Sequence, residues 1–309
     1  MSLVSFIKGK GANGFGNGST AEEVTKGISL TGKNILVTGC NSGLGKETVR
    51  VLALRGANII GTARTKEKAE SACKELSGSA HIGLECELAN PVSVKACVAE
   101  IKKRKIKLDV IICNAGIMAL PKLEKAFGYE LQFFTNHIGH FILVTGLLDS
   151  LAEEGRVVML SSAAHKMAPN VGIDFENLSG ENGYNDWKFY GQSKFANLLF
   201  AKELARRFST TKKTAYAMHP GVIKTNLSRS MHPIQQFVFG LFEPIFLKSV
   251  PQGAATECYL ASSPDIISNS GGYFADSNLA KPRRDAENPE VAKKLWEVSE
   301  KIVAELKLS

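Results

Sequence analysis

The chain has 309 residues, enough for one α/β domain with a full hydrophobic core. Its formal net charge is +8, but the lysines and arginines are spread along the sequence, which is typical of a solvated surface and argues against a nucleic-acid partner. No apolar run is long enough to span a membrane, and the start lacks the apolar segment of a signal peptide. We therefore expect neither a spanning helix nor secretion.

Six cysteines occur without any Cys-x-x-Cys pair, at positions 40, 73, 86, 97, 113 and 258. This spacing favours reduced thiols in an intracellular protein over a disulfide framework, and it predicts no metal site. We expect a cytoplasmic protein, although residues 1–21 carry two lysines and no acid and so leave organellar targeting open. We expect residues 1–21 to be floppy, and we assign residues 1–30 to an N-terminal arm and residues 31–309 to the domain.

The first predicted element is a buried strand over residues 34–38, followed by a glycine-rich turn. Glycines at 39, 43 and 45 allow a tight bend, and the helix predicted over residues 46–55 directs its positive N-terminal end toward that bend. Backbone amides at such a helix start bind phosphate groups. The sequence therefore predicts an anion-binding turn.

The stretch Thr38-Gly39-Cys40-Asn41-Ser42-Gly43-Leu44-Gly45 resembles the cofactor turn Thr-Gly-x-x-x-Gly-x-Gly of the short-chain dehydrogenases/reductases. That resemblance implies a single Rossmann-type, doubly wound α/β domain, with a mostly parallel seven-stranded sheet flanked by helices, that binds a nicotinamide dinucleotide. The extended-type epimerases and dehydratases, an alternative, carry Thr-Gly-x-x-Gly-x-x-Gly instead. The turn residues implied to contact the cofactor are Gly39, Asn41, Ser42, Gly43, Leu44 and Gly45.

A second strand is predicted over residues 57–62, and Arg64 follows it where a dinucleotide site holds the adenosine ribose. An acid at this place selects NAD through the ribose 2′-hydroxyl, whereas a guanidinium grips a 2′-phosphate. Arg64 therefore predicts NADP (NADPH) as the cofactor.

A helix over residues 66–76, a strand over 81–86, a helix from Pro91 to the basic run 102–105 and a strand over 108–113 come next. Glu87 stands where the family has an adenine-capping aspartate, and Cys113 replaces the first residue of its Asn-Asn-Ala-Gly motif. The residues of this region implied to contact the cofactor are Glu87, Leu88, Asn114, Ala115 and Gly116.

The pattern over residues 122–151 is helical and includes a polar Asn136 in an apolar stretch, which is costly unless the amide is hydrogen-bonded. His137 and His140 share one helix face, but no acidic or cysteine partner at ligand spacing supports a metal. The resemblance implies that Asn136 kinks the helix and holds a water on the proton path.

A fifth strand over residues 156–162 delivers serines at its carboxyl end, and Tyr190-Gly191-Gln192-Ser193-Lys194 opens an amphipathic helix. Tyr190 and Lys194, at i and i+4, share one face of that helix. The residues that match the family's catalytic tetrad in order and context are Asn136, Ser162, Tyr190 and Lys194. Tyr190 and Lys194 are also implied to contact the cofactor.

A sixth strand over residues 215–218 precedes a loop that resembles the family's Pro-Gly loop. The residues implied to contact the nicotinamide there are Pro220, Gly221, Ile223 and Thr225. The stretch 228–250 is too apolar for an exposed loop; we favour a substrate lid, with core packing or peripheral membrane contact as alternatives. The remaining predicted elements are a helix over 251–261, a strand over 272–274 and a helix over 289–306.

The resemblance implies an enzyme that interconverts a carbonyl and its alcohol with NADP(H). Tyr190 would act as general acid/base, with its pKa lowered by the Lys194 ammonium, while Ser162 binds the substrate oxygen. Aromatic residues of the lid and before Tyr190 favour a lipophilic aldehyde or ketone; the latter are Phe175, Tyr184, Trp187 and Phe189. The alternative is a binding module that senses NADP occupancy and has a protein partner. Whether the protein forms a dimer stays open.

Four passages make the chain most similar to the retinol-dehydrogenase-like proteins and the chloroplast translocon-associated dehydrogenases: residues 19–24, 135–141, 190–194 and 219–221. From about residue 20 onward the resemblance covers nearly the whole chain.

Overall fold

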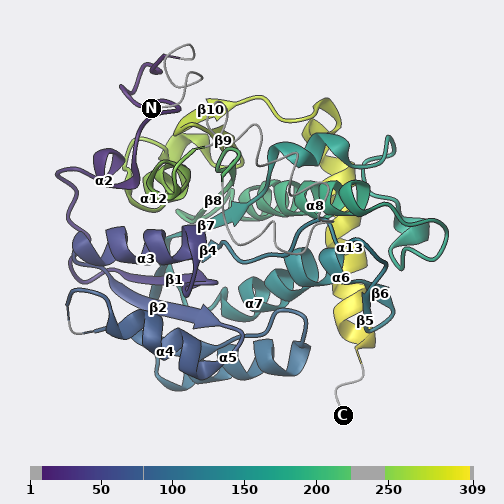
Figure 1. The fold of residues 1–309 in the computed structure, drawn as a ribbon, viewed down its shortest axis with the longest axis horizontal. Coiled ribbons are helices and arrows are strands. Elements are labelled where there is room, and N and C mark those ends of the chain that lie inside the picture. The colour runs from purple at the N-terminus through teal and green to yellow at the C-terminus, as the bar shows by residue number, and fades with distance from the viewer. Residues whose placement is uncertain (1–8, 79, 224–247, 307–309) are drawn as a thin grey trace.

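The computed structural model describes residues 9–78, 80–223 and 248–306. Its central sheet has eight strands in the order β10-β9-β8-β7-β4-β1-β2-β3, all parallel except for the β9–β10 pair (Figure 1). These strands are β1 (Asn34–Thr38), β2 (Asn58–Ala63), β3 (Ile82–Glu85), β4 (Leu108–Cys113), β7 (Leu151–Leu160), β8 (Thr214–His219), β9 (Tyr273–Ala275) and β10 (Asn278–Ala280). A separate hairpin joins β5 (Lys125–Ala126) to β6 (Tyr129–Glu130).

Helices follow most strands of the parallel part. The α-helices are α2 (Ala21–Val24), α3 (Gly43–Leu54), α4 (Lys66–Lys74), α5 (Pro91–Lys103), α6 (Leu131–Phe133), α7 (Gly139–Leu147), α8 (Asp186–Arg207), α11 (Val250–Gly253), α12 (Ala255–Ser262) and α13 (Pro289–Glu305). The other helical turns are the π-helix η1 (Phe134–Ile138) and the 3-10 turns η2 (Ala163–Met167), η3 (Phe175–Asn177), η5 (Ile267–Asn269) and η6 (Arg284–Glu287).

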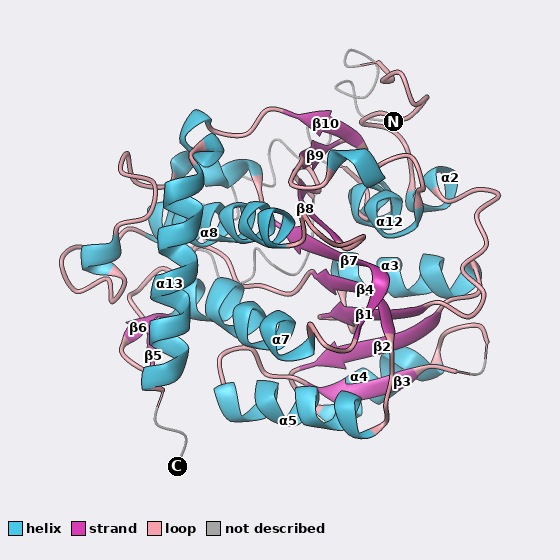
Figure 2. Ribbon diagram, turned by 180° about the vertical axis from the view of Figure 1, so that it is seen from behind, coloured by secondary structure: helices cyan, strands magenta, loops and turns pink. Residues whose placement is uncertain are grey.

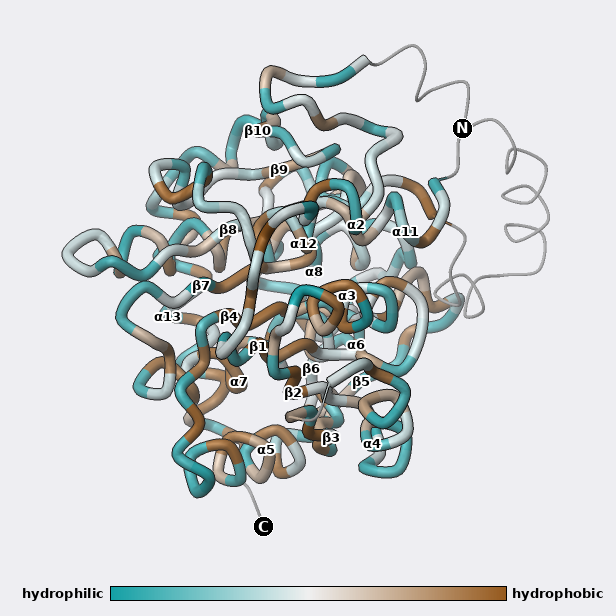
Figure 3. The backbone as a smooth tube through the Cα atoms, turned by 90° about the vertical axis from the view of Figure 1, so that its left-hand side faces the viewer, coloured by the Kyte–Doolittle hydropathy of each residue, from teal (hydrophilic) through white to brown (hydrophobic). Residues whose placement is uncertain are grey.

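The sheet is buried on both faces, so its parallel strands are apolar along their length and stand out as hydrophobic segments in Figure 3. Alternate residues of β1 enter different cores: Leu36 packs with α5, α7 and α8, whereas Ile35 and Val37 pack with α3, α4 and α12. Figure 2 shows α5, α7 and α8 in front of the sheet, with α13 packed outside α8. The fold is therefore a three-layer α/β domain.

The strand order reverses at β1, because the chain runs outward through β2 and β3 and then returns to add β4 on the other side of β1. Open α/β sheets bind ligands at the carboxyl ends of the strands that flank such a reversal. The glycine-rich turn follows β1, and Asn114 follows β4. The topology therefore brings two segments with predicted cofactor contacts to the same edge.

Two hairpins were not predicted from the sequence, and one of them raises the number of strands in the sheet from the expected seven to eight. In the β5–β6 turn Phe127 and Gly128 both have positive φ, and in the β9–β10 turn Asp276 and Ser277 do. Two successive positive φ angles are typical of the type I′ turn that suits a two-residue hairpin. Phe at the first turn position and the pair Asp-Ser are unusual in type I′ turns. Neither hairpin therefore carries the Asn-Gly or Asp-Gly signal from which such a turn can be predicted.

Two helix boundaries also differ from expectation. The helical region predicted over residues 122–151 starts only at Leu131, after the β5–β6 hairpin, and its last residue begins β7. The helix expected to open at Tyr190 begins one turn earlier at Asp186, because the Asn185 side chain accepts a hydrogen bond from the Lys188 amide and caps it. Tyr190 therefore lies inside a formed helix.

The N-terminal arm is not floppy over residues 9–30. Thr20 and Glu23 form a capping box at α2, and Ala21 and Val24 are buried. The Asn13 amide donates to the carbonyl of Ser277 at 2.7 Å, and Asn278 donates to the carbonyl of Phe15 at 3.0 Å. These contacts fasten the arm to the β9–β10 turn, as the two neighbouring segments in Figure 1 indicate.

Candidate active site

The glycine-rich turn leaves a space that any larger residue would fill. Gly39 has φ of +73°, which favours glycine, and a Cβ on Gly45 would lie 2.2 Å from the Gly39 carbonyl oxygen and 2.6 Å from Asn114 Nδ2. Ser42 is the N-cap residue of α3, yet within the described chain its side chain accepts no hydrogen bond from the helix. The first amides of α3 are therefore left to bind an anion.

A network of hydrogen bonds ties the ends of β1 and β4 together beside this turn. Asn114 Nδ2 donates to the Thr38 carbonyl at 2.8 Å, and the Ala115 amide donates to Thr38 Oγ1 at 3.0 Å. Thr38 Oγ1 in turn lies 2.9 Å from His140 Nε2. The Asn114 amide thus supports the turn even though Cys113 replaces the first asparagine of the family motif.

His140 has a role in this network that the sequence did not predict. Its Nδ1 lies 2.9 Å from the Asn136 carbonyl, which can only accept, so Nδ1 carries the proton and Nε2 accepts from Thr38. Burial lowers the pKa of His140 to about 4, so the ring is neutral. Only the i, i+4 spacing of Asn136 and His140 could have indicated this bond.

Asn136 lies on the π-helix η1, where the resemblance implies a kink. It is fully buried, and its side-chain amide hydrogen-bonds to two other segments. Oδ1 accepts from the Ile117 amide at 2.8 Å, and Nδ2 donates to the Ile117 carbonyl and to Ser193 Oγ, both at 2.9 Å. These bonds remove the desolvation penalty that a polar residue would otherwise carry in the core. Asn136 thereby joins the loop after β4 to α8.

The structure brings Ser162, Tyr190 and Lys194 together. Ser162 follows β7, and its side chain lies close enough to the Tyr190 phenol to lower the pKa of that group. Lys194 lies on α8 with its Nζ 5.8 Å from the centre of the Tyr190 ring, and it donates to the Leu160 carbonyl at 3.1 Å. A Cβ on Gly116 would lie 2.8 Å from Asn136 Oδ1 and 3.3 Å from Lys194 Nζ, so Asn136 and Lys194 border the same point.

Burial dominates the ionisation of the tyrosine and the lysine. It raises the pKa of Tyr190 to about 12, although the Ser162 side chain acts in the opposite direction, and it lowers the pKa of Lys194 to about 8. The pKa of Tyr190 is therefore raised in the protein alone, where the sequence argument expects it to be lowered, because the cost of burying a phenolate is the largest effect. Tyr190 is a neutral phenol at pH 7.

The Pro-Gly loop reaches the glycine-rich turn from the other side. Gly221 has φ of +96°, and a Cβ on Gly253 would collide with Ile223 Cδ1 at 2.2 Å and Leu44 Cδ2 at 2.7 Å. Ile223 and Leu44 therefore meet over Gly253. Thr225 and most of the proposed lid, residues 228–247, lie outside the described residues.

A buried ion pair next to this loop was not predicted either. Lys248 Nζ lies 2.6 Å from Asp276 Oδ1, and Lys248 stacks its stem against Gly221. The aspartate belongs to the type I′ turn of β9–β10, and the lysine pairs through its backbone with Val222. Because 28 residues separate the two charges, only the tertiary structure reveals the pair.

The adenosine end of the predicted site is open. Arg64 is exposed between β2 and α4, and among the described residues its side chain makes no hydrogen bond or ion pair. Glu87 uses Oε1 to accept from the Ala89 amide at 3.1 Å, so its carboxylate caps its own turn. Leu88 is buried, and its carbonyl lies where a side chain on Gly139 would be.

The four aromatic residues singled out before Tyr190 lie in different surroundings. The Trp187 ring lies edge-on to the Tyr190 ring at 6.1 Å. Phe189 packs against Tyr184 at 5.2 Å, and Phe175 lies beneath the Lys294 ammonium. Of these four, Trp187 is therefore the one placed to contact a substrate at Tyr190.

A comparison with protein families matches residues 33–235 of the chain to the short chain dehydrogenase family. The chain belongs to the short-chain dehydrogenases. It is an oxidoreductase of this family, whose members use nicotinamide cofactors.

This short-chain dehydrogenase is similar to relatives along nearly its whole length. It is 37% identical to the chloroplastic short-chain dehydrogenase TIC 32 A of Brassica napus, with 99% of this chain and 100% of that protein covered. It is 38% identical to human retinol dehydrogenase 14, with 90% and 88% covered. A solved protein of Mycobacterium paratuberculosis is 32% identical with a TM-score of 0.74 and covers 94% of this chain. The resemblance stated from the sequence is confirmed at this level.

The residues of the short-chain dehydrogenase fit a dinucleotide. The turn from Gly39 to Gly45 leaves backbone space and uncapped amides for the phosphates, as derived above. At the other end the buried Lys194 ammonium has three N–H donors, of which the Leu160 carbonyl takes one, and Gly116 leaves room in front of it.

The described residues contain neither a membrane-spanning helix nor a cluster of metal ligands. In the described ranges no helix has the length and apolar character needed to cross a bilayer. The same ranges hold no cluster of three or more potential metal ligands, and the two histidines weighed as ligands bond elsewhere: His137 Nε2 to Ser299 Oγ, and His140 as described.

Proposed function

We propose that this protein is an NADP(H)-dependent oxidoreductase that interconverts a lipophilic aldehyde or ketone and its alcohol, with Tyr190 as general acid/base. The observation that carries the proposal is the placement of Ser162 and Tyr190 beside the buried Lys194, at the same edge of the sheet as the glycine-rich turn. The residues proposed to contact the cofactor are Gly39, Asn41, Ser42, Gly43, Leu44, Gly45, Arg64, Glu87, Leu88, Asn114, Ala115, Gly116, Tyr190, Lys194, Pro220, Gly221, Ile223 and Thr225.

The bound nicotinamide supplies or accepts the hydride, and the protein handles the proton. In reduction the neutral Tyr190 phenol gives its proton to the substrate oxygen while the Ser162 hydroxyl donates a hydrogen bond to the same atom. The Lys194 donors hold the ribose, and its charge stabilises the phenolate that remains. The buried Asn136 amide, bonded to Ser193 and the loop after β4, holds the helix in place for proton return from solvent.

The two reaction directions should respond differently to pH. Because the pKa of Tyr190 is about 12, the phenol needed for reduction is fully present from pH 6 to 8, whereas the phenolate needed for oxidation is scarce and increases with pH. We expect kcat/KM for alcohol oxidation to rise by about tenfold or more from pH 7 to 9, and that for reduction to stay level between pH 6 and 7, below the pKa of about 8 at which Lys194 loses its charge. Profiles measured in both directions check this; an oxidation profile that is level with pH would contradict it.

Arg64 should set the preference for NADPH. Arg64→Ala is expected to weaken NADPH binding by about 10- to 100-fold with little change for NADH, because only NADPH carries the 2′-phosphate that a guanidinium binds. Binding is measured by nucleotide fluorescence titration. Lys74→Ala, an exposed lysine at the far end of α4, is the matched control for the loss of one positive charge. Equal weakening of both nucleotides by Arg64→Ala would rule out the phosphate role.

The substrate class is tested by NADPH oxidation against aldehydes and ketones graded in size and polarity. Trp187 beside Tyr190 and the apolar lid sequence support a rise in kcat/KM with the apolar length of the substrate. A preference for small polar carbonyls would contradict the lipophilic assignment. Tight NADPH binding without turnover of any carbonyl would instead favour the binding-module alternative.

A further inference from the structure

Two cysteines from distant parts of the chain share one contact point. Cys40 lies in the glycine-rich turn and Cys73 on α4, and both pack on Gly61 of β2. A Cβ on Gly61 would lie 2.8 Å from the sulfur of each, so the two sulfurs are at most twice that distance apart. The two side chains are close enough for each to shift the pKa of the other thiol. Only a glycine at 61 leaves room for both sulfurs.

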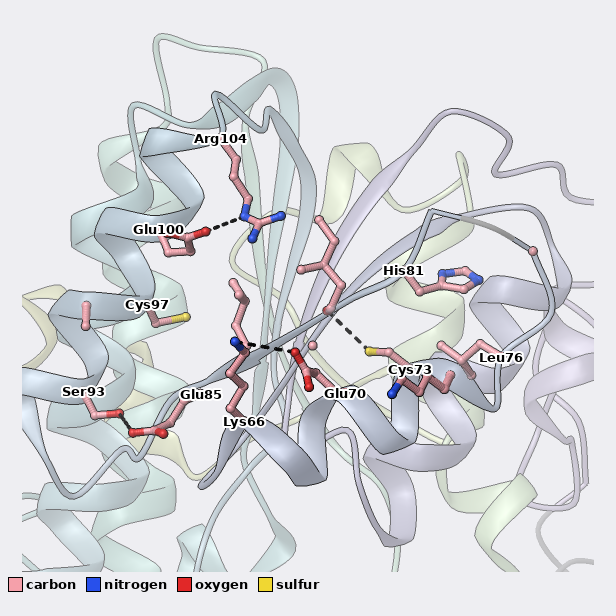
Figure 4. A pocket seen from close by; sticks show the side chains of 16 residues that line it. Lys66, Glu70, Cys73, Leu76, His81, Glu85, Ser93, Cys97, Glu100 and Arg104 are labelled. Atoms are coloured by element: carbon pink, nitrogen blue, oxygen red, sulfur yellow. Dashed lines mark hydrogen bonds and ion pairs between the residues drawn. The ribbon is translucent and has the colours of Figure 1, made fainter.

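Solvent reaches this pair from the Cys73 side. Cys73 lines a cavity of about 960 Å³ between α4, the edge strand β3 and α5, which Figure 4 shows from close by. Its sulfur donates to the Ile82 carbonyl at 3.4 Å on the cavity wall. Cys40 is fully buried behind it. A small solute entering the cavity therefore meets the sulfur of Cys73 before that of Cys40.

The local electrostatics give the two thiols different reactivities. The neighbouring Cys40 side chain lowers the pKa of the Cys73 thiol, whereas the Cys73 side chain and burial raise the pKa of the Cys40 thiol. A lowered pKa increases the thiolate fraction, and the thiolate is the nucleophile. Cys73 is thus suited to react first, and Cys40 remains a neutral thiol within reach.

We propose that Cys40 and Cys73 form a reversible disulfide when the protein meets a peroxide. The Cys73 thiolate attacks one peroxide oxygen, the O–O bond breaks, and the sulfur becomes a sulfenic acid while water forms with one added proton. The Cys40 sulfur then attacks the Cys73 sulfur and displaces the hydroxyl group, which leaves as a second water with the Cys40 proton. Two thiols lose two electrons, and one peroxide gains them.

The disulfide would act on the cofactor turn, a consequence that rests on the proposed function. The amides of Gly39 and Cys40 both donate to the Thr62 carbonyl, at 2.8 and 3.0 Å, and fix the turn against β2. A sulfur–sulfur bond of about 2.0 Å is shorter than any hydrogen-bonded contact, so it pulls Cys40 toward α4. We expect the oxidised protein to bind NADPH about tenfold more weakly or worse, and reduction by dithiothreitol to restore binding.

The test treats the whole protein with hydrogen peroxide, blocks free thiols and maps disulfide-linked peptides by mass spectrometry. The expected product links the peptides of Cys40 and Cys73 and is absent from Cys73→Ser and Cys73→Ala. Cys97→Ser is the matched control, since Cys97 lines the same cavity and lies close enough to Cys86 to raise the pKa of that thiol. Six free thiols after peroxide, or a link between Cys86 and Cys97 in place of the expected one, would overturn the proposal.

NADPH titration of reduced and oxidised samples separates the two proposals. If the mapped disulfide forms and the affinity is unchanged, the regulatory consequence is wrong. If the reduced protein does not bind NADPH, the proposed function fails while the mapped disulfide still decides the chemistry of the pair. Cys73→Ser should bind NADPH normally and lose its sensitivity to peroxide.

Discussion

Tyr190→Phe is expected to lower kcat/KM for carbonyl reduction by about 10³-fold while the Kd for NADPH stays within about twofold. The phenyl ring keeps the packing against Trp187, so the change removes only the hydroxyl group that would donate the proton. Steady-state kinetics and nucleotide fluorescence measure the two quantities. This is the largest effect we predict, because the Tyr190 phenol is the group proposed to give its proton to the substrate oxygen.

Tyr216→Phe is the matched control. Tyr216 is also buried, and its hydroxyl donates to the Ile266 carbonyl at 3.0 Å on the other side of the sheet from α8. Its loss should cost about 1 kcal/mol of the free energy of unfolding and leave kcat unchanged. Full activity in Tyr190→Phe, or equal loss in both variants, would show that the tyrosine is not the proton donor.

Gly45→Ala is expected to weaken NADPH binding by at least about 100-fold. The new methyl group would lie 2.2 Å from the Gly39 carbonyl oxygen, a backbone atom that cannot rotate away. The turn must therefore open, and its amides would no longer point toward the phosphates. Isothermal titration with NADPH measures the loss, and circular dichroism at the same temperature reports on folding.

Gly146→Ala tests whether any added methyl has the same effect. Gly146 is a helical glycine on α7, and its Cβ would lie 3.1 Å from the two methyl groups of the Val98 side chain and away from the glycine-rich turn. Its NADPH affinity should match that of the unaltered protein. If Gly45→Ala is folded and binds NADPH normally, the glycine-rich turn is not the phosphate site.

The parallel core of the fold could be predicted because its signals are local. The apolar run 34–38 and the glycines after it place a strand and a turn without any tertiary knowledge, and the strands over 108–113 and 214–219 have the same continuous apolar pattern. The hairpins at Phe127 and Asp276 could not be predicted in this way. Phe127 and Ser277 hold positive φ angles that their residue types do not favour, so the turns lack the usual sequence signal.

The candidate site likewise combines features that the sequence predicts with features that depend on tertiary contacts. The spacing of Ser162, Tyr190 and Lys194 is a property of the sequence, and the structure brings these residues together. The pKa of Tyr190 depends on how much of the fold buries it, and the sequence indicates a nearby ammonium but no burial. His140 and the Lys248–Asp276 pair also depend on tertiary contacts, so neither could be assigned a role beforehand.

The π-helix at residues 134–138 changes the direction in which the side chains of the following helix, α7, point. Each residue of an α-helix turns the next side chain by about 100°, so one residue more in a single turn shifts everything downstream by that angle. The shift lets Asn136 face the loop after β4 while Phe141 and Leu143 still enter the apolar interior. A regular helix of the same sequence would have to give up one of these two orientations.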